Sequence, residues 1–177
     1  MNKINAIAVA CLMAAVLAGC SKTKTEQPVA PLFNPPAQLP MATEAQPKLP
    51  TMKIYLGDQV MDTEMALTAR EESTGMMFRT NIPEDDSMLF DLYVPQAASF
   101  WMTNCPVSES AAYISPDGII EEIHHFEKND PTPVVATNNN ILFVLETADG
   151  WFDRHNIKVG TVIRGEKGSL RDSIPQR

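Results

Sequence analysis

The chain has 177 residues, with 22 Asp and Glu against 14 Lys and Arg, for a formal net charge of −8. This length is enough for one ordinary domain. An acidic balance argues against nucleic acid as a partner, because Lys and Arg are needed to neutralise its phosphates. An apolar fraction of 44% and an aromatic fraction of 7% are typical of a globular protein.

The first twenty residues have the pattern of an export signal. Lys3 supplies a positive charge, and residues 4–17 form an apolar stretch, broken only by Asn5, that is too short for a comfortable membrane span. The stretch ends in Leu17-Ala18-Gly19-Cys20, which resembles a bacterial lipobox. We therefore expect a lipoprotein signal peptide over residues 1–19 and a lipid on Cys20. A plain secretory signal with a chance Cys is the alternative.

A lipid on Cys20 predicts a compartment and a partner. Acyl chains such as palmitate anchor a protein in a lipid bilayer because each buried methylene contributes about 0.8 kcal/mol. The chain is thus expected at the cell envelope. Ser21 rather than Asp follows the Cys, and by resemblance to the sorting rule of Gram-negative lipoproteins this favours the outer membrane, facing the periplasm. Cys11 is removed with the signal peptide and the thiol of Cys20 carries the lipid. Cys105 is then the one remaining thiol, so no internal disulfide is expected.

Residues 20–51 are predicted to form the lipidated start and a disordered tether. The segment has few large apolar residues to drive collapse, and its many prolines preclude helix and most strand pairing. These prolines are Pro28, Pro31, Pro35, Pro36, Pro40, Pro47 and Pro50.

The folded domain is expected over residues 52–165. Residues 52–56 indicate a strand, and the alternation in the strand that follows places Met65 on one face and Glu64 on the other. Thr68-Ala69-Arg70-Glu71 matches a capping box, so a short helix begins there, and Gly75 is placed to end it.

Short strands and turns fill the rest of this domain. They are a strand over 88–94 stopped by Pro95, one that begins at 100–102, a hairpin of 111–114 and 119–126 around the turn 115–118, an apolar run over 141–145, and a last strand over 161–163. A second short helix is expected over 150–155. This pattern predicts a mainly β fold, a compact antiparallel, barrel-like sheet with two short helices, with α+β as the alternative. Residues 166–177 are expected to be a flexible tail.

Four sequence blocks stand out for their order and spacing. They are Gly75-Met76-Met77-Phe78-Arg79, Met88-Leu89-Phe90, Phe100-Trp101-Met102-Thr103-Asn104, and Val144-Leu145-Glu146 followed by Gly150-Trp151 and Ile157-Lys158-Val159-Gly160. Together they resemble the domain-of-unknown-function 192 family over nearly all of the domain. The resemblance implies a compact, mostly β domain that is often exported. It supplies no established activity, so no catalytic residue is carried over.

Three positions depart from the pattern of that family. Ser87 stands where the family has Gly, Ser110 where it has an acidic residue, and Thr161 where it has Asp. If the missing carboxylate takes part in a family-wide activity, this chain has lost or altered that activity. Glu109 is adjacent to Ser110, but a shift of one residue in a strand points a side chain to the opposite face, so Glu109 is a poor substitute.

Arg79 and Asn104 are the best candidates for a polar binding site. Both follow apolar blocks that are expected in the core, so both are expected at the rim of one cavity, with Trp101 near Asn104. An Arg at such a rim binds a carboxylate or phosphate through two hydrogen bonds. The structural interpretation, which we favour, is that Arg79 pairs with an acidic neighbour and Asn104 caps a turn. The acidic neighbours are Glu72, Asp85 and Asp86.

Two groups of residues raise the question of a metal. Met102 and Cys105 offer soft ligands of the kind that bind copper, but Met more often fills gaps in a core, which we favour. His125 and Glu127 share a strand face and have the chemistry of zinc ligands. A closed zinc site needs further ligands, such as His155 from the second helix. We therefore expect core packing and no metal or other cofactor.

The sequence contains no nucleophile elbow, no phosphate-binding Gly loop and no Cys–His pair at a recognisable spacing. This favours a non-enzymatic envelope module, a lipid-anchored domain that binds a protein or a small ligand. Two alternatives stay open. One is an enzyme of unrecognised mechanism that uses Arg79 and Asn104, and the other is a copper- or zinc-binding protein.

Overall fold

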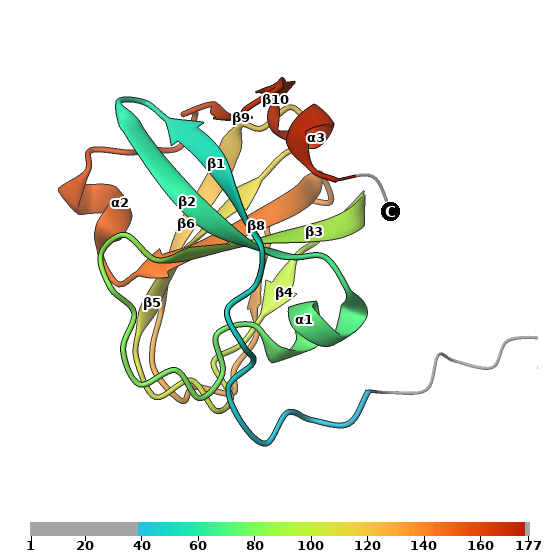
Figure 1. Cartoon of the computed structure of the whole chain (residues 1–177), viewed down its shortest axis with the longest axis vertical. Coiled ribbons are helices and arrows are strands. Elements are labelled where there is room, and N and C mark those ends of the chain that lie inside the picture. Colours follow the sequence, from blue (N-terminus) through green and yellow to red (C-terminus); the bar gives the residue numbers. More distant parts are fainter. Residues whose placement is uncertain (1–38, 176–177) are drawn as a thin grey trace, which may run out of the picture. The chain divides into compact units, whose positions relative to one another are not determined.

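A curled β-sheet forms the centre of the computed structural model, which describes residues 39–175 (Figure 1). The sheet has the strand order β10-β9-β1-β2-β3-β8-β5-β6, and a separate ribbon pairs β4 with β7. The strands are β1 (Thr51–Leu56), β2 (Gln59–Ala66), β3 (Ser87–Gln96), β4 (Ser99–Phe100), β5 (Glu109–Ile114), β6 (Ile120–Phe126), β7 (Val134–Val135), β8 (Ile141–Ala148), β9 (Ile163–Gly165) and β10 (Gly168–Ser169). The helices are α1 (Ala69–Thr74), α2 (Trp151–Arg154) and α3 (Leu170–Ser173). Cys20 and the predicted signal peptide lie outside the described residues.

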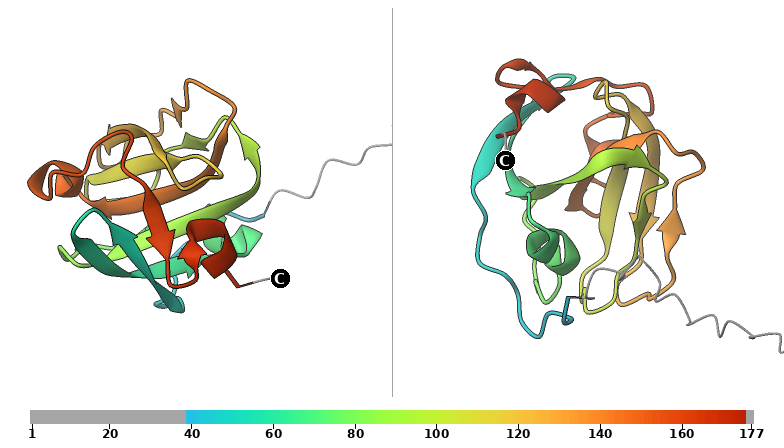
Figure 2. Two further views of the ribbon diagram at one scale, coloured as in Figure 1. Left: turned by 90° about the horizontal axis from the view of Figure 1, so that it is seen from above. Right: turned by 90° about the vertical axis from the view of Figure 1, so that its right-hand side faces the viewer.

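The strand pairing makes this sheet an open half-barrel. Neighbouring strands pair antiparallel except β2 and β3, which run parallel. Helix α1 lies in the connection from β2 to β3, because a parallel pair needs a crossover. The sheet curls in the views of Figure 2, and its end strands β10 and β6 do not pair with each other. The mainly β, barrel-like fold expected from the sequence is confirmed.

Two apolar cores are built on the sheet, because side chains alternate between its faces along each strand. The first core includes Leu89, Ala112, Leu145, Trp151, Phe152 and Leu170, and the second includes Met76, Met77, Met88, Phe90, Met102, Cys105, Tyr113 and Val144. Helices α2 and α3 contribute to the first core. The segments after α1 and around β4 contribute to the second, which is where the candidate site lies.

Two local motifs expected from the sequence are confirmed. The Thr68 hydroxyl accepts from the Glu71 backbone N–H at 3.2 Å, and the Glu71 carboxylate accepts from the Thr68 N–H at 2.8 Å, which completes the capping box of α1. The hairpin turn between β5 and β6 is closed by the Gly118 N–H, which donates to the Ser115 carbonyl at 2.9 Å.

The C-terminal end of the domain differs from the expectation. Residues 166–177 are expected to form a flexible tail, yet their described part contains β10 and α3. Leu170 and Ile174 are buried and join the first core. Burial of these apolar side chains offsets the cost of ordering the polar residues around them. None of the helices in the described part is long and apolar enough to cross a membrane.

The last residues of the predicted tether also lie along the domain. Ala42 is buried in the second core. The Gln46 side-chain amide donates to the Gly75 carbonyl at 2.8 Å, and Arg70 donates to the Pro40 carbonyl at 3.1 Å. Backbone–side-chain hydrogen bonds of this kind replace the strand pairing that the prolines prevent.

Candidate functional site

Three glutamates on one face of the sheet form the centre of the candidate site. The register places Glu64 of β2 opposite Met88 of β3, and Met88 opposite Glu146 of β8. Ala111 of β5 lies opposite Glu146, and Glu109, two residues earlier on β5, points to the same face. None of the three glutamates is more than 5% exposed. The sheet therefore gathers acidic groups inside an apolar core, where charge is costly.

Arg79 neutralises the first of these glutamates. Its guanidinium donates two hydrogen bonds to the Glu64 carboxylate, at 2.7 and 2.8 Å, and the Leu49 backbone N–H donates a third at 2.8 Å. Burial acts to raise the pKa of Glu64, but these hydrogen bonds outweigh burial and hold the pKa below its ordinary value. Glu64 is therefore ionised at neutral pH, and Arg79 is its counter-ion.

Glu109 and Glu146 form a second pair, of carboxyl against carboxyl. Burial raises the pKa of Glu109 well above its ordinary value, and the neighbouring Glu146 raises it further. Burial also raises the pKa of Glu146 to about 8, against the opposing effects of a hydrogen bond with Glu109 and of the charge on Arg79. Two carboxylates at one site repel each other, so the pair holds at least one proton at neutral pH. Within residues 39–175, Oε2 of Glu109 has no hydrogen-bond partner.

Glu146 lines a pocket of about 590 Å³, a size that suits a small organic molecule. The pocket lies among the end of the predicted tether, α1, the loop after α1, β3 and β4. The other lining residues are Leu39, Pro40, Met41, Ala69, Glu72, Ser73, Thr74, Gly75, Met76, Met77, Phe90, Leu92, Ser99, Phe100, Trp101 and Cys105. Most of them are apolar, so the pocket offers hydrocarbon and aromatic surface around a buried carboxyl group.

The structure separates the residues that the sequence proposed as a polar site. Trp101 lines the pocket and is 48% exposed, while Arg79 and Asn104 are not among the lining residues. Arg79 and Asn104 do lie on neighbouring segments, because the Phe78 N–H donates to the Asn104 carbonyl at 2.7 Å. Asn104 has a positive φ of 64°, a turn conformation that Asn tolerates better than most residues.

The residues considered as metal ligands lie in different surroundings. Met102 and Cys105 are buried in the second core, where burial raises the pKa of the Cys105 thiol and keeps it protonated. The His125 side chain on β6 is 53% exposed, and His155 bonds Glu84 at 2.9 Å. No group of three or more His, Cys, Asp or Glu that could hold a metal ion occurs within the described part of the chain.

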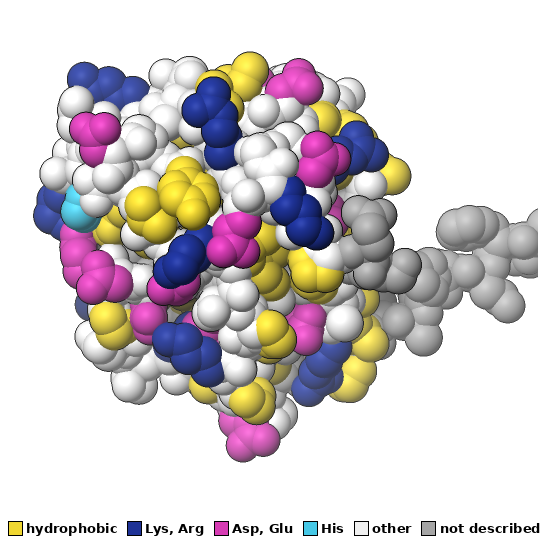
Figure 3. All heavy atoms as spheres, turned by 45° about the horizontal axis from the view of Figure 1, so that its top comes forward, with side chains coloured by type: hydrophobic (Ala, Val, Ile, Leu, Met, Phe, Trp, Pro, Cys, Tyr) yellow, Lys and Arg dark blue, Asp and Glu magenta, His cyan; other side chains and the backbone are white. Residues whose placement is uncertain are grey.

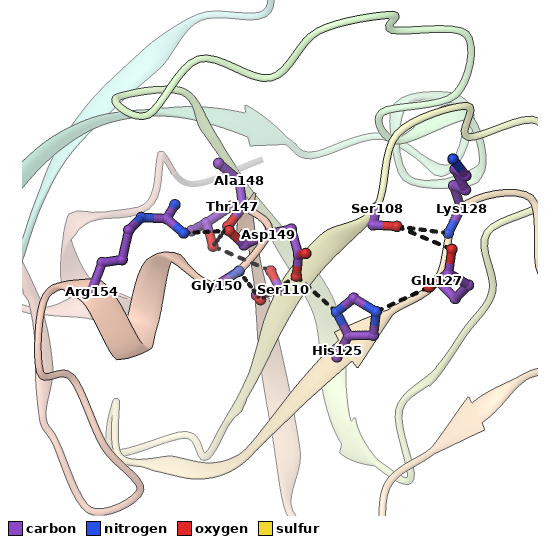
Figure 4. Close-up of polar contacts among 10 residues, drawn as sticks. All are labelled: Ser108, Ser110, His125, Glu127, Lys128, Thr147, Ala148, Asp149, Gly150 and Arg154. Atoms are coloured by element: carbon purple, nitrogen blue, oxygen red, sulfur yellow. Dashed lines mark hydrogen bonds and ion pairs between the residues drawn. The ribbon is translucent and has the colours of Figure 1, made fainter.

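Ser110 belongs to a separate polar cluster (Figure 4). Its hydroxyl accepts from the Gly150 N–H at 2.9 Å and lies 3.5 Å from the Asp149 carboxylate. His125 bonds the same carboxylate at 2.7 Å and Glu127 at 3.3 Å, and both contacts raise its pKa. Asp149 thus bonds both Ser110 and His125, whereas an activated serine needs the imidazole as its own partner. The cluster joins β5, β6 and the start of α2.

Sequence reasoning misses the Glu109–Glu146 pair. Glu146 directly follows the apolar run 141–145, and an acidic residue that continues a buried strand is the signal that marks it. Glu109 is set aside above because it points away from the face of Ser110. It does point to the opposite face, and that face holds Glu146.

Comparisons with known proteins agree on a family. The model of DUF192, described as "Uncharacterized ACR", matches residues 52–165, which confirms the resemblance read from the sequence blocks. A crystal structure of a protein of unknown function from Novosphingobium aromaticivorans is 29% identical, with a TM-score of 0.62 over 66% of this chain and 86% of that one. A putative transcription regulator from Sinorhizobium meliloti has 21% identity and a TM-score of 0.64, over 68% and 98% of the chains, and shares the fold. No curated protein matches the chain.

Proposed function

Because the chain belongs to the DUF192 family, whose description names no activity, we propose a function from the pocket: the domain binds a small, largely apolar ligand. The observation that carries the proposal is the pocket of about 590 Å³ with apolar walls and Glu146 among its lining residues. Binding sites of this kind combine an apolar concave surface with a small number of polar groups that orient the ligand.

The surroundings of the pocket favour a small ligand over the protein partner that the sequence left open. The lining residues come from segments far apart in the chain, and together they form a concave, partly open site. On the face drawn in Figure 3, Lys and Arg side chains are interspersed with Asp and Glu side chains.

Fluorescence of an apolar dye tests the pocket. We use the full chain with Cys20→Ser and titrate it with N-phenyl-naphthylamine. We expect saturable binding at one site. Ser99→Trp places a large ring at the pocket wall and is expected to weaken binding by at least about tenfold, which is about 1.4 kcal/mol.

The control for that variant is Val60→Trp. Val60 lies on β2, is 56% exposed and does not line the pocket, so the added ring should leave the dye affinity unchanged. If the dye does not bind, or if both variants bind it as well as the parent chain, the proposed ligand site is wrong.

A lipid on Cys20 is the second part of the proposal, and it places the pocket at the envelope membrane. Its support is the lipobox-like Leu17-Ala18-Gly19-Cys20 after a short apolar stretch. Mass spectrometry of the processed parent chain should find acyl chains on Cys20 as its first residue, and Cys20→Ser should carry none. An unmodified amino terminus that keeps residues 1–19 would contradict the anchor.

A further inference from the structure

We propose that the pocket takes an apolar ligand with a positively charged amine or quaternary ammonium head, and that this head displaces a proton from the Glu109–Glu146 pair into solvent. The inference rests on the proposed ligand site and names the chemistry of its ligand. The pocket walls supply Phe100 and the half-exposed Trp101, whose ring faces attract cations. Glu146 supplies a carboxyl group at the same pocket.

The charges on this face of the sheet leave room for one more cation. Glu64, Glu109 and Glu146 are all buried. The guanidinium of Arg79 is held by Glu64 through two hydrogen bonds. Among residues 39–175, no Lys or Arg forms an ion pair with either member of the Glu109–Glu146 pair. A proton therefore takes the place that a counter-ion would occupy.

Apart from Arg79, which Glu64 already holds, the groups described around Glu146 carry no positive charge. Cys105 and Tyr113 face the pair, and burial raises the pKa of each so far that both stay neutral in the physiological range. Glu72 on α1 also lines the pocket. A cation gains from the negative charge on Glu146 once the proton has left, whereas a neutral ligand does not.

A matched pair of ligands tests the inference on the full chain with Cys20→Ser. Phenylbutyltrimethylammonium carries a permanent charge, and phenylbutanol has the same apolar part without a charge. Because each bound cation releases one proton, its Kd should fall by up to about tenfold per pH unit from about pH 6 to about pH 8. Titration calorimetry in buffers of different ionisation enthalpy should show a release of up to one proton for the ammonium compound and none for the alcohol.

Two variants assign the effect to the carboxyl pair. Glu146→Gln cannot ionise, so it should lower ammonium affinity by at least about tenfold at about pH 8, remove the pH dependence, and keep phenylbutanol affinity. Glu109→Gln keeps a neutral hydrogen-bond donor for Glu146, whose pKa is lowered by its hydrogen bond with Glu109, so the pH dependence of the Kd for the ammonium compound should persist. Asp58→Asn removes a formal charge outside the pocket and should leave the affinity for both ligands unchanged.

The outcomes distinguish this inference from the proposed function. In one outcome phenylbutanol and N-phenyl-naphthylamine bind, while the ammonium compound binds no more tightly than phenylbutanol at any pH. In that case the charge inference fails and the apolar pocket stands. Proton release that persists in Glu146→Gln also overturns it. If none of the three compounds binds, the proposed function fails and this inference fails with it.

Discussion

At the scale of single residues, the guanidinium of Arg79 is bound by one buried partner, which predicts a structural role for Arg79. The pair with Glu64 has side chains 14% and 2% exposed. Arg79→Ala leaves a buried carboxylate without its counter-ion, so we expect a loss of about 3–5 kcal/mol in the free energy of unfolding. Urea denaturation measures it.

Arg154 offers the matched control for this prediction. It pairs with Glu84 through side chains that are 47% and 45% exposed, so Arg154→Ala should destabilise the fold far less than Arg79→Ala. The double variant Glu64→Leu with Arg79→Met removes both buried charges and should regain most of the loss. Equal losses for the two Arg variants would contradict the burial of the Arg79–Glu64 pair.

The sequence predicts part of this residue-scale arrangement. The block over residues 75–79 singles out Arg79 as a candidate site residue. Alternation along β2 correctly places Glu64 and Met65 on opposite faces of the strand. It does not identify Glu64 as the partner, because the loop after α1 that covers this face comes from elsewhere in the chain. What a strand face packs against is a non-local property, and alternation alone does not contain it.

Gly118 fixes the junction of two elements, the β5–β6 hairpin and β9. Its φ is +79°, and a Cβ atom there would lie 2.5 Å from the carbonyl oxygen of Ile163. Gly118→Ala should therefore destabilise the fold by about 3 kcal/mol or more, because backbone must move as well as adopt a strained φ. Thermal unfolding followed by circular dichroism measures the effect.

Gly160→Ala is the control that distinguishes backbone strain from a steric clash. Its φ is +89°, and a Cβ atom would meet nothing within 4 Å. Gly160→Ala should cost only the backbone strain, about 1–2 kcal/mol. If the two variants are equally stable, the close approach of Gly118 to Ile163 does not exist in solution.

Local signals account for the elements that the sequence predicts well. The capping box at Thr68 and the turn before Gly118 involve residues within a few positions of one another, so the pattern contains the interaction. The parallel pairing of β2 with β3 and the ribbon of β4 with β7 join segments far apart. Helix α3 is missed because Leu170 and Ile174 are isolated apolar residues in a polar segment, and only the first core explains their burial.

The buried carboxyls give the whole molecule a characteristic pH dependence of stability. The pKa values of Glu109 and Glu146 are raised on folding, so between about pH 5 and about pH 8 the folded state binds more protons than the unfolded state. Stability should fall as pH rises through this window, by about 1.4 kcal/mol per pH unit for each extra proton. Urea denaturation at a series of pH values measures the slope.

Glu64 acts in the opposite direction at lower pH. Its pKa is lowered on folding, so its contribution is present above about pH 4.5 and is lost as pH falls through the folded-state value. Glu146→Gln removes one titrating group and should flatten only the upper window. The same slope above about pH 5 in the parent chain and in Glu146→Gln would contradict the raised pKa.

At this scale the sequence predicts the class of the fold and the family. It misses the candidate site, because the site depends on three strands that bring Glu64, Glu109 and Glu146 onto one face. Glu146 is marked by the apolar run before it, but Glu64 and Glu109 are unremarkable in their own stretches of sequence. Their shared burial arises only when the sheet is assembled.

The two tryptophans of the chain differ in a way that has a practical consequence. Trp101 is 48% exposed and lines the pocket, while Trp151 is 2% exposed and belongs to the first core. Entry of any compound into the pocket changes the solvent around one indole and leaves the other as an internal reference. Intrinsic emission, compared between the parent chain and Trp101→Phe, therefore reports occupancy without a label.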